Sequence, residues 1–304
     1  MASARSSMPK SPYFRLAEVA DGTWAAISAN PVHGVSNSSI VDLGGRWLVV
    51  DTFMSALAAK DLRVVVSALA GEAPVWVVNT HFHVDHVGGN DVFAGAAAIF
   101  GTDAAREGVL RAAAGIPERQ ATAEAAAAAV PADDPRRPNI DDRLGVLRRL
   151  RLVAPNATIG DRLTLFGDRR RAELVALGTA HTNSDLAVYL PEEAPVLTGD
   201  AVVNRTIPFV IDGDAPAWLG ALDRLRGFGA RTLVPGHGGL GDASTIDAME
   251  ACLRALISGA QAFAASGEVP AAPEEFASWS GMERFGEMVK LVAAKSGQVP
   301  TGAA

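Results

Sequence analysis

Residues 81–86 read HFHVDH and follow shortly after the apolar run VWVV at 75–78. This hexapeptide holds three of the six histidines of the chain and one aspartate. In an extended strand, His81 and His83 would point to the same side, and Asp85 would continue that alternation. Imidazole nitrogen and carboxylate oxygen are ligands of zinc, iron and manganese, and groups packed this densely would leave unmet polar atoms without a cation. The hexapeptide therefore predicts a metal site.

Three further polar residues stand at or beside the ends of apolar, strand-like runs farther along the chain. They are His181 in GTAHTNSDLAVYLP, Asp200 in VLTGDAVVN and His237 in LVPGHGG. Loops at strand ends carry chemistry on a rigid scaffold, so each residue stands where a ligand is expected. A single histidine in such a place is usually an ordinary polar residue. Seven such residues together, with His86 as the fourth member of the hexapeptide, favour a metal centre.

The composition limits the class of function. The chain has 304 residues, of which 49% are hydrophobic, so we expect a globular protein with a substantial core. A formal net charge of −7 argues against nucleic acid as a partner. The single cysteine, Cys252, excludes an intrachain disulfide and a cysteine-rich zinc site, and its surroundings AMEACLRAL predict a core position. No signal peptide or membrane-spanning run is visible, which predicts a cytoplasmic protein without a membrane partner.

Segments with strand-like and with helical residue patterns alternate along the chain. This alternation predicts a single α/β domain over residues 13–304 after a flexible tail at 1–12. The alanine-rich stretch at about 103–150 predicts a helical insertion. Two C-terminal helices are expected within about 243–295, at 243–265 and 273–295. The expected strands are 23–28, 38–43, 46–52, 74–80, 95–103, 156–167, 171–178, 186–191, 194–200 and 231–236, with further helices at 54–71 and 215–229.

The ordered segments THFHVDHVGGN, GTAHTNSDLAVYLP, VLTGD and PGHG resemble the metallo-β-lactamase fold superfamily. The resemblance covers most of residues 15–240 and implies a four-layer αβ/βα sandwich, with the metals at one edge of the sheets. It also implies the ligands of two metals. The first metal would be held by His81, His83 and His181, the second by Asp85, His86 and His237, with Asp200 bridging the two.

Two metals in such a site share one hydroxide as the nucleophile, and Asp85 is the expected catalytic residue that orients it. The resemblance therefore predicts a dinuclear hydrolase with two Zn²⁺ per chain, iron and manganese remaining open. The predicted substrate is a carbonyl ester, thioester, lactone or amide of a small molecule. The alternatives are a non-haem iron oxidoreductase such as a persulfide dioxygenase, a non-hydrolytic cyclase or lyase in biosynthesis, and a non-catalytic metal-binding protein.

The segments around Asp200 also bear on the subtype. β-Lactamases that resemble this pattern typically carry Cys or Ser in place of Asp200, which argues against a true β-lactamase. The segments GDAVVNRTIPFV and EEFASWSGMERF resemble hydrolases associated with sulfur-oxidation clusters and quinoprotein relay systems.

Three residues outside the metal set are candidate substrate contacts. Arg205 follows Asp200 by five residues and could clamp an anionic group. Phe209 could line the pocket, and His33 lies in a loop that would rim the site in this fold. The insertion at 103–150 would either cap the site or form the surface of a homodimer.

Overall fold

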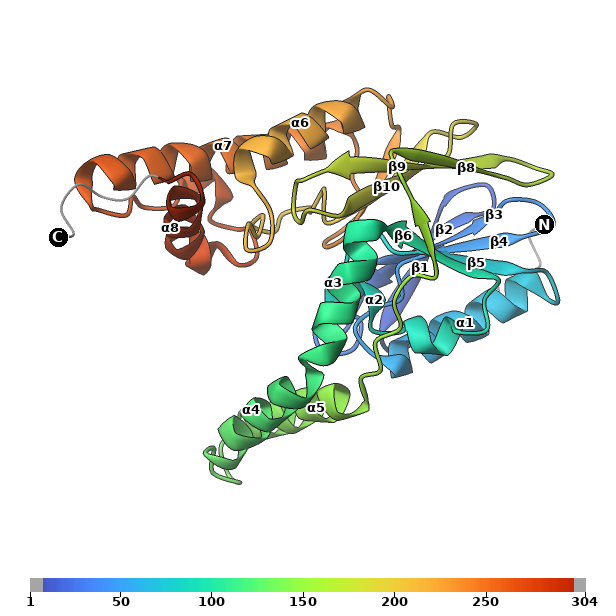
Figure 1. Ribbon diagram of the computed structural model, residues 1–304, viewed down its shortest axis with the longest axis horizontal. Coiled ribbons are helices and arrows are strands. Elements are labelled where there is room, and N and C mark those ends of the chain that lie inside the picture. Colours follow the sequence, from blue (N-terminus) through green and yellow to red (C-terminus); the bar gives the residue numbers. More distant parts are fainter. Residues whose placement is uncertain (1–7, 298–304) are drawn as a thin grey trace. The chain divides into compact units, whose positions relative to one another are not determined.

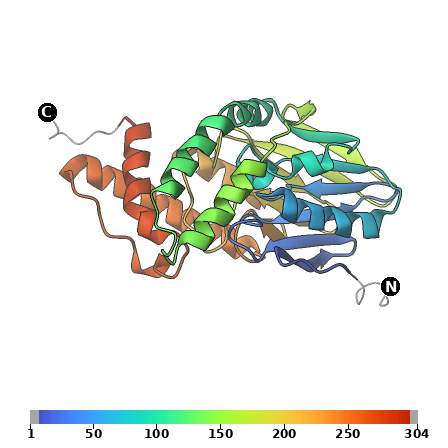
Figure 2. The ribbon, with the colours of Figure 1, turned by 90° about the horizontal axis from the view of Figure 1, so that it is seen from below.

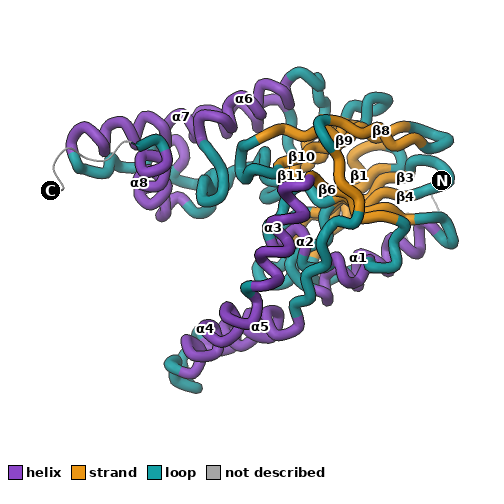
Figure 3. Tube along the Cα trace, viewed as in Figure 1, coloured by secondary structure: helices purple, strands orange, loops and turns teal. Residues whose placement is uncertain are grey.

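The computed structural model describes residues 8–297 and divides the chain into two compact units (Figure 1). Unit 1 runs up to Ile159 and includes Phe166–Arg171, and unit 2 comprises Gly160–Leu165 and the chain from Ala172 onward. Each unit combines one β-sheet with helices, which confirms the predicted α/β class (Figure 3). Residues 1–7 of the expected tail lie outside the described residues.

The sheet of unit 1 has seven strands in the order of the sequence, from β1 to β7. The strands β1 (Phe14–Ala20), β2 (Thr23–Ser28), β3 (Ser38–Asp42) and β4 (Trp47–Val50) form an antiparallel meander. The strands β5 (Val75–Val78), β6 (Ala98–Thr102) and β7 (Ala157–Ile159) continue from β4 in parallel. Parallel neighbours end at the same edge of a sheet, so the residues that follow β4 and β5 emerge together.

Helix α1 (Ala56–Ala70) connects β4 to β5. It begins where Ser55 caps it, since the Ser55 hydroxyl accepts a hydrogen bond from the amide of Ala58 at 3.2 Å. Its apolar residues recur at helical spacing, and Leu62, Val65 and Val66 are buried in the core of unit 1 with residues of the sheet.

The helical segment predicted at 103–150 consists of α3 (Asp103–Ala114), α4 (Ile116–Ala128) and α5 (Arg137–Arg149). Helices α4 and α5 lie side by side (Figures 1 and 2). The side chain of Gln120 donates to the carbonyl of Leu147 at 2.9 Å, and Arg148 pairs with Glu124 at 2.8 Å. Small alanine side chains let the two helices approach while most of α4 stays exposed.

The sheet of unit 2 has five strands in the order β12-β11-β10-β9-β8. Its strands are β8 (Arg162–Phe166), β9 (Arg171–Gly178), β10 (Asp185–Tyr189), β11 (Pro195–Gly199) and β12 (Thr232–Pro235). The pair β11 and β12 is parallel and is connected through α6 (Ala215–Arg226). Helices α7 (Ala243–Ser266) and α8 (Phe285–Lys295) complete the unit, and the core around Trp218 contains Cys252, as predicted.

Two expectations about elements are wrong, and one strand was missed. The β-type stretch 156–167 is two strands: the chain turns at Gly160–Asp161, and β7 and β8 join different sheets. Strand β1 was not predicted. The helix expected over 273–295 is α-helical only from Phe285: the chain before it forms 3-10 helices at Glu274–Phe276 and Met282–Arg284. Between them Gly281 adopts a left-handed conformation with φ 80°, which a continuous α-helix does not contain. Among the described helices, none is both long and apolar enough to cross a membrane.

Candidate metal centre

Four predicted donors lie together in unit 1, although not on a strand. Strand β5 ends at Val78, and the chain turns through His81 and His83 into the one-turn helix α2 (Val84–Val87). The predicted strand alternation through Asp85 is therefore wrong, because the chain has left the sheet before the donors begin.

The turn nevertheless gathers the four side chains. The ring of His81 lies 4.8 Å from that of His83 and 4.2 Å from that of His86, between ring centroids. The Oδ2 atom of Asp85 lies 3.6 Å from Nε2 of His86. His81 and His86 are fully buried.

Asp51 fixes the orientation of two of these histidines. It follows β4, and its amide donates to the carbonyl of Val78 at the end of the parallel strand β5 at 2.8 Å. Its carboxylate accepts from the amide of Thr80 at 2.8 Å, from the Thr80 hydroxyl at 2.7 Å, and lies 2.7 Å from Nδ1 of His86. A carboxylate only accepts, so Nδ1 of His86 carries the proton.

The same reasoning assigns the tautomer of His81. The Thr80 hydroxyl donates its single proton to Asp51, so its contact of 3.0 Å with Nδ1 of His81 must be one that the hydroxyl accepts. Both histidines thus carry their proton on Nδ1 and present the Nε2 lone pair, which is the form that binds metals.

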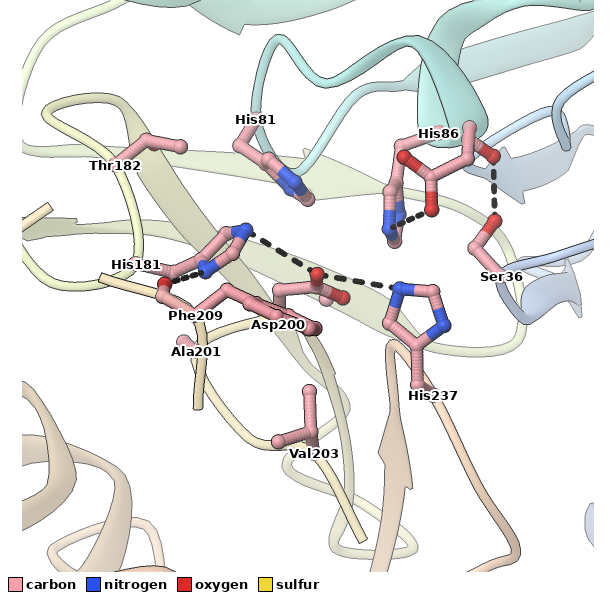
Figure 4. A network of polar contacts seen from close by, with 12 residues as sticks. Ser36, His81, His86, His181, Thr182, Asp200, Ala201, Val203, Phe209 and His237 are labelled. Carbon is pink, nitrogen blue, oxygen red and sulfur yellow. Dashed lines mark hydrogen bonds and ion pairs between the residues drawn. The ribbon is translucent and has the colours of Figure 1, made fainter. Parts of the chain in front are cut away.

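The backbone of α2 is also tied to the loops beside it. The Ser36 hydroxyl donates to the carbonyl of Asp85 at 2.5 Å (Figure 4), and the amide of Thr52 donates to the carbonyl of His86 at 2.8 Å. These bonds hold the two donors of α2 in place independently of their side chains.

The remaining three donors lie together in unit 2. Asp200 follows β11 and His237 follows β12, so the parallel pairing of these strands brings them to one edge. Figure 4 shows His181 and His237 pointing toward Asp200 from opposite sides. The Oδ2 atom of Asp200 lies 3.2 Å from Nε2 of His181 and 3.3 Å from Nε2 of His237.

His181 is oriented in the same way as the histidines of unit 1. Its Nδ1 atom lies 2.9 Å from the carbonyl oxygen of Phe209, which only accepts, so Nδ1 donates. Its ring packs against Trp218, with centroids 5.4 Å apart. The turn after His181 is held by Asp185, which accepts from the amide and the hydroxyl of Thr182 at 2.8 and 2.9 Å.

These tautomers test whether a cation fits the donors. With Nδ1 protonated, Nε2 of neutral His181 faces a carboxylate oxygen of Asp200 as one acceptor facing another. In unit 1, Nε2 of His86 faces Asp85 in the same way. Two acceptors repel unless a cation stands between them, and imidazole with carboxylate is the donor set of zinc, iron and manganese. The side chains of both units therefore fit divalent metal.

Sequence reasoning missed Asp51 and Thr80, which touch the donors. The sequence does contain a pattern that points to Asp51: RWLVVDT places this acidic residue directly after an apolar strand, as VLTGD does for Asp200. Only the pairing of β4 with β5 shows that this carboxylate reaches Thr80 and His86.

The three candidate substrate contacts have different positions. The carbonyl oxygen of Phe209 lies 2.9 Å from Nδ1 of His181, next to Asp200. The ring of Phe209 lies under the guanidinium of Arg284, 4.6 Å from it. Arg205 lines a pocket of unit 2 that none of the seven donors lines. His33 is buried in unit 1, with Nδ1 2.9 Å from the hydroxyl of Ser55 and Nε2 3.1 Å from Asp142 of α5. Their roles toward a substrate stay predictions.

The fold and the two clusters define an α/β protein with a candidate metal centre of histidine and aspartate. Residues 32–237 match the family profile of the Metallo-beta-lactamase superfamily, and the chain belongs to that family.

Solved structures agree with this membership. A metallo-beta-lactamase from Pontibacter korlensis superposes with a TM-score of 0.59 and 20% identity, over 79% of this chain and 99% of that one. TMB-1, whose structure was described in relation to substrate and inhibitor binding, gives 0.59 and 17%, over 81% and 99%. The stereoselective inverting sec-alkylsulfatase Pisa1 from Pseudomonas sp. gives 0.67 and 20%, over 95% of this chain and 51% of that one. These likenesses confirm the predicted metallo-β-lactamase fold.

Proposed function

We propose that this protein is a dinuclear metal hydrolase acting on a small molecule with a carbonyl ester, thioester, lactone or amide. One ion would be held by His81, His83 and His181, the other by Asp85, His86 and His237, with Asp200 between the two. Zinc is the proposed metal, and the proposed subtype is the hydrolases of sulfur-oxidation and quinoprotein relay systems.

The observation that carries the proposal is the common tautomer of the histidines. Asp51, Thr80 and the carbonyl of Phe209 each engage an Nδ1 atom, so three imidazoles present Nε2 as the donor atom. A purely structural histidine has no need of this uniform arrangement. Partners that hold the outer nitrogen of a ligand histidine are the usual support of a catalytic metal.

Bound dications would lower the pKa of a shared water and polarise a substrate carbonyl. Side chains of the protein would orient the attacking water and hold the metal ions. Asp85 sits on a backbone held by Ser36 and would align the attacking water with its carboxylate. The buried carboxylate of Asp200, between His181 and His237, would keep negative charge where the two positive ions need it.

The test is metal content per chain, measured by mass spectrometry on protein purified without added metal. We expect about two zinc ions per chain, a loss of at least one in His83→Ala, and turnover on some member of an ester, thioester and lactone panel. His33→Ala is the matched control for metal content, because His33 is the one histidine outside the donor set. About one iron per chain with thiol-dependent oxygen uptake would instead support an oxidoreductase and overturn the proposal.

A further inference from the structure

Unit 2 contains a pocket of about 400 Å³ that the proposed chemistry does not use. Its walls come from the segment after β11, from the first half of α7 and from the segment before α8. Its volume is in the range of sites that hold small organic ligands. Its lining includes Arg205, Glu275, Phe276 and Trp279.

Arg205 is held in the pocket wall in a strained conformation. Its φ is 52°, in the left-handed region that arginine rarely adopts. Hydrogen bonds of 2.9 Å from the amide of Ser280 to the carbonyl of Arg205, and from the amide of Ile207 to that of Ser280, keep it there. Its guanidinium forms no ion pair with any residue in 8–297. Strain of this kind persists where the surrounding structure imposes it, often at ligand sites.

Glu275 contributes the opposite charge to the same lining. Its carboxylate likewise forms no ion pair within the described part of the chain. Its negative charge also acts on Cys252 of α7, because burial first and Glu275 second raise the pKa of that thiol. Ala248 and Ala251 of α7 line the same pocket.

Aromatic rings supply the apolar part of the lining. Phe276 is buried, Trp279 is half-buried, and their rings meet edge to face with centroids 4.9 Å apart. The pocket thus combines one cationic group, one anionic group and an aromatic wall.

We propose that this pocket binds a small zwitterion with an apolar side chain, of the α-amino acid class. Arg205 would hold the carboxylate through two parallel hydrogen bonds, Glu275 would hold the ammonium, and the aromatic rings would contact the side chain. A ligand with only one charge would pair with only one of these two exposed groups, and so would bind less well.

The pocket also shares a residue with the loop of His237. Asn204 lines it, and the amide of Asn204 donates to the carbonyl of His237 at 2.9 Å.

The proposed amino-acid site is a second ligand site and does not depend on the proposed hydrolase function.

The protein carries its own reporter, because Trp279 is the one of its five tryptophans that lines the pocket. L-phenylalanine, 3-phenylpropanoate and 2-phenylethylamine would be titrated at millimolar concentrations, followed by tryptophan fluorescence and by calorimetry. We expect L-phenylalanine to bind roughly tenfold or more tightly than either singly charged analogue. In Trp279→Phe the fluorescence change should disappear while heat of binding remains.

Two variants test the charged groups. Arg205→Gly removes the guanidinium but accepts the left-handed φ, so it should fold, and Glu275→Gln removes one charge. Each should weaken L-phenylalanine roughly tenfold or more, whereas Arg254→Ala and Glu274→Gln, neighbours that do not line the pocket, should not. The proposal is overturned if no amino acid binds, if 3-phenylpropanoate binds as well as L-phenylalanine, or if Glu275→Gln binds normally. L-phenylalanine is also titrated into His83→Ala, where it should bind as in the parent protein although a proposed metal ligand is lost. The amino-acid site and the hydrolase proposal can therefore fail separately.

Discussion

The carboxylate of Asp51 lies 2.7 Å from Nδ1 of His86, although 34 residues stand between them in the chain. The same carboxylate binds Thr80, whose hydroxyl contacts Nδ1 of His81. One buried acid therefore sets the tautomer of two adjacent imidazoles, and this makes it the most informative residue outside the donor set.

Asp51→Asn should lower metal affinity about 10- to 100-fold. An amide cannot accept from Thr80 and His86 with both of its heavy atoms, so at least one imidazole loses its fixed Nδ1 proton. Competition against a coloured chelator measures the affinity. Asp133→Asn, an exposed loop change in unit 1, is the control. Unchanged affinity in folded Asp51→Asn protein would remove Asp51 from the centre.

Gly236→Ala should displace Asp200 and reduce metal binding. A Cβ atom at residue 236 would lie 1.9 Å from Oδ1 of Asp200 and 2.7 Å from the backbone carbon of Gly199, distances that no side chain tolerates. Gly239→Ala is a close control, because a Cβ there meets nothing within 4 Å. The metal content and the thermal unfolding temperature of the two variants are compared. Equal behaviour of the two variants would contradict the placement of Asp200 against Gly236.

Asp200→Ala should lower the metal content by at least one ion per chain and abolish most turnover. The substitution removes the carboxylate that faces Nε2 of both His181 and His237, and with it the negative charge between two positive ions. Asp223→Ala changes an exposed acid of unit 2 and serves as the control. An active Asp200→Ala protein with a full metal complement would contradict the assignment of Asp200 as the ligand between the two ions.

Cys252 should react with thiol reagents only when the protein unfolds. Burial, helped by the charge of Glu275, raises the pKa of this thiol from 9.0 to about 12, and only the thiolate is nucleophilic. At pH 8 the labelling rate should therefore follow the unfolding rate, with Cys252→Ala as the blank. Rapid labelling of the native protein would show that the thiol is accessible.

The same shift gives a direction for stability against pH. The folded thiol keeps its proton above the pH at which the unfolded thiol loses it. The contribution of Cys252 to stability is therefore fully present below pH 9 and is lost as the pH rises through about 12. Chemical unfolding at pH 8 and pH 10 should show a smaller decline in Cys252→Ala than in the parent protein.

The sequence by itself determined the chemistry of the donors and the class of the fold. The hexapeptide at 81–86 and the separate positions of His181, Asp200 and His237 form an ordered pattern, readable without coordinates because residue type and spacing carry it. Alternating β-type and helical texture was enough for the α/β class, and the alanine-rich composition was enough for the helices at 103–150.

Tertiary structure alone decided what surrounds those donors. Asp51 reaches His86 because β4 and β5 pair in parallel and in a register that aligns Val50 with Val78, and pairing between distant segments leaves no local mark in a sequence. The turn of the chain after Val78 likewise depends on packing, so Asp85 lies on α2 and not on a strand. Arg205 lines a pocket with Glu275 that none of the seven donors lines, because a backbone bond ties Arg205 to Ser280 in a distant segment of the chain.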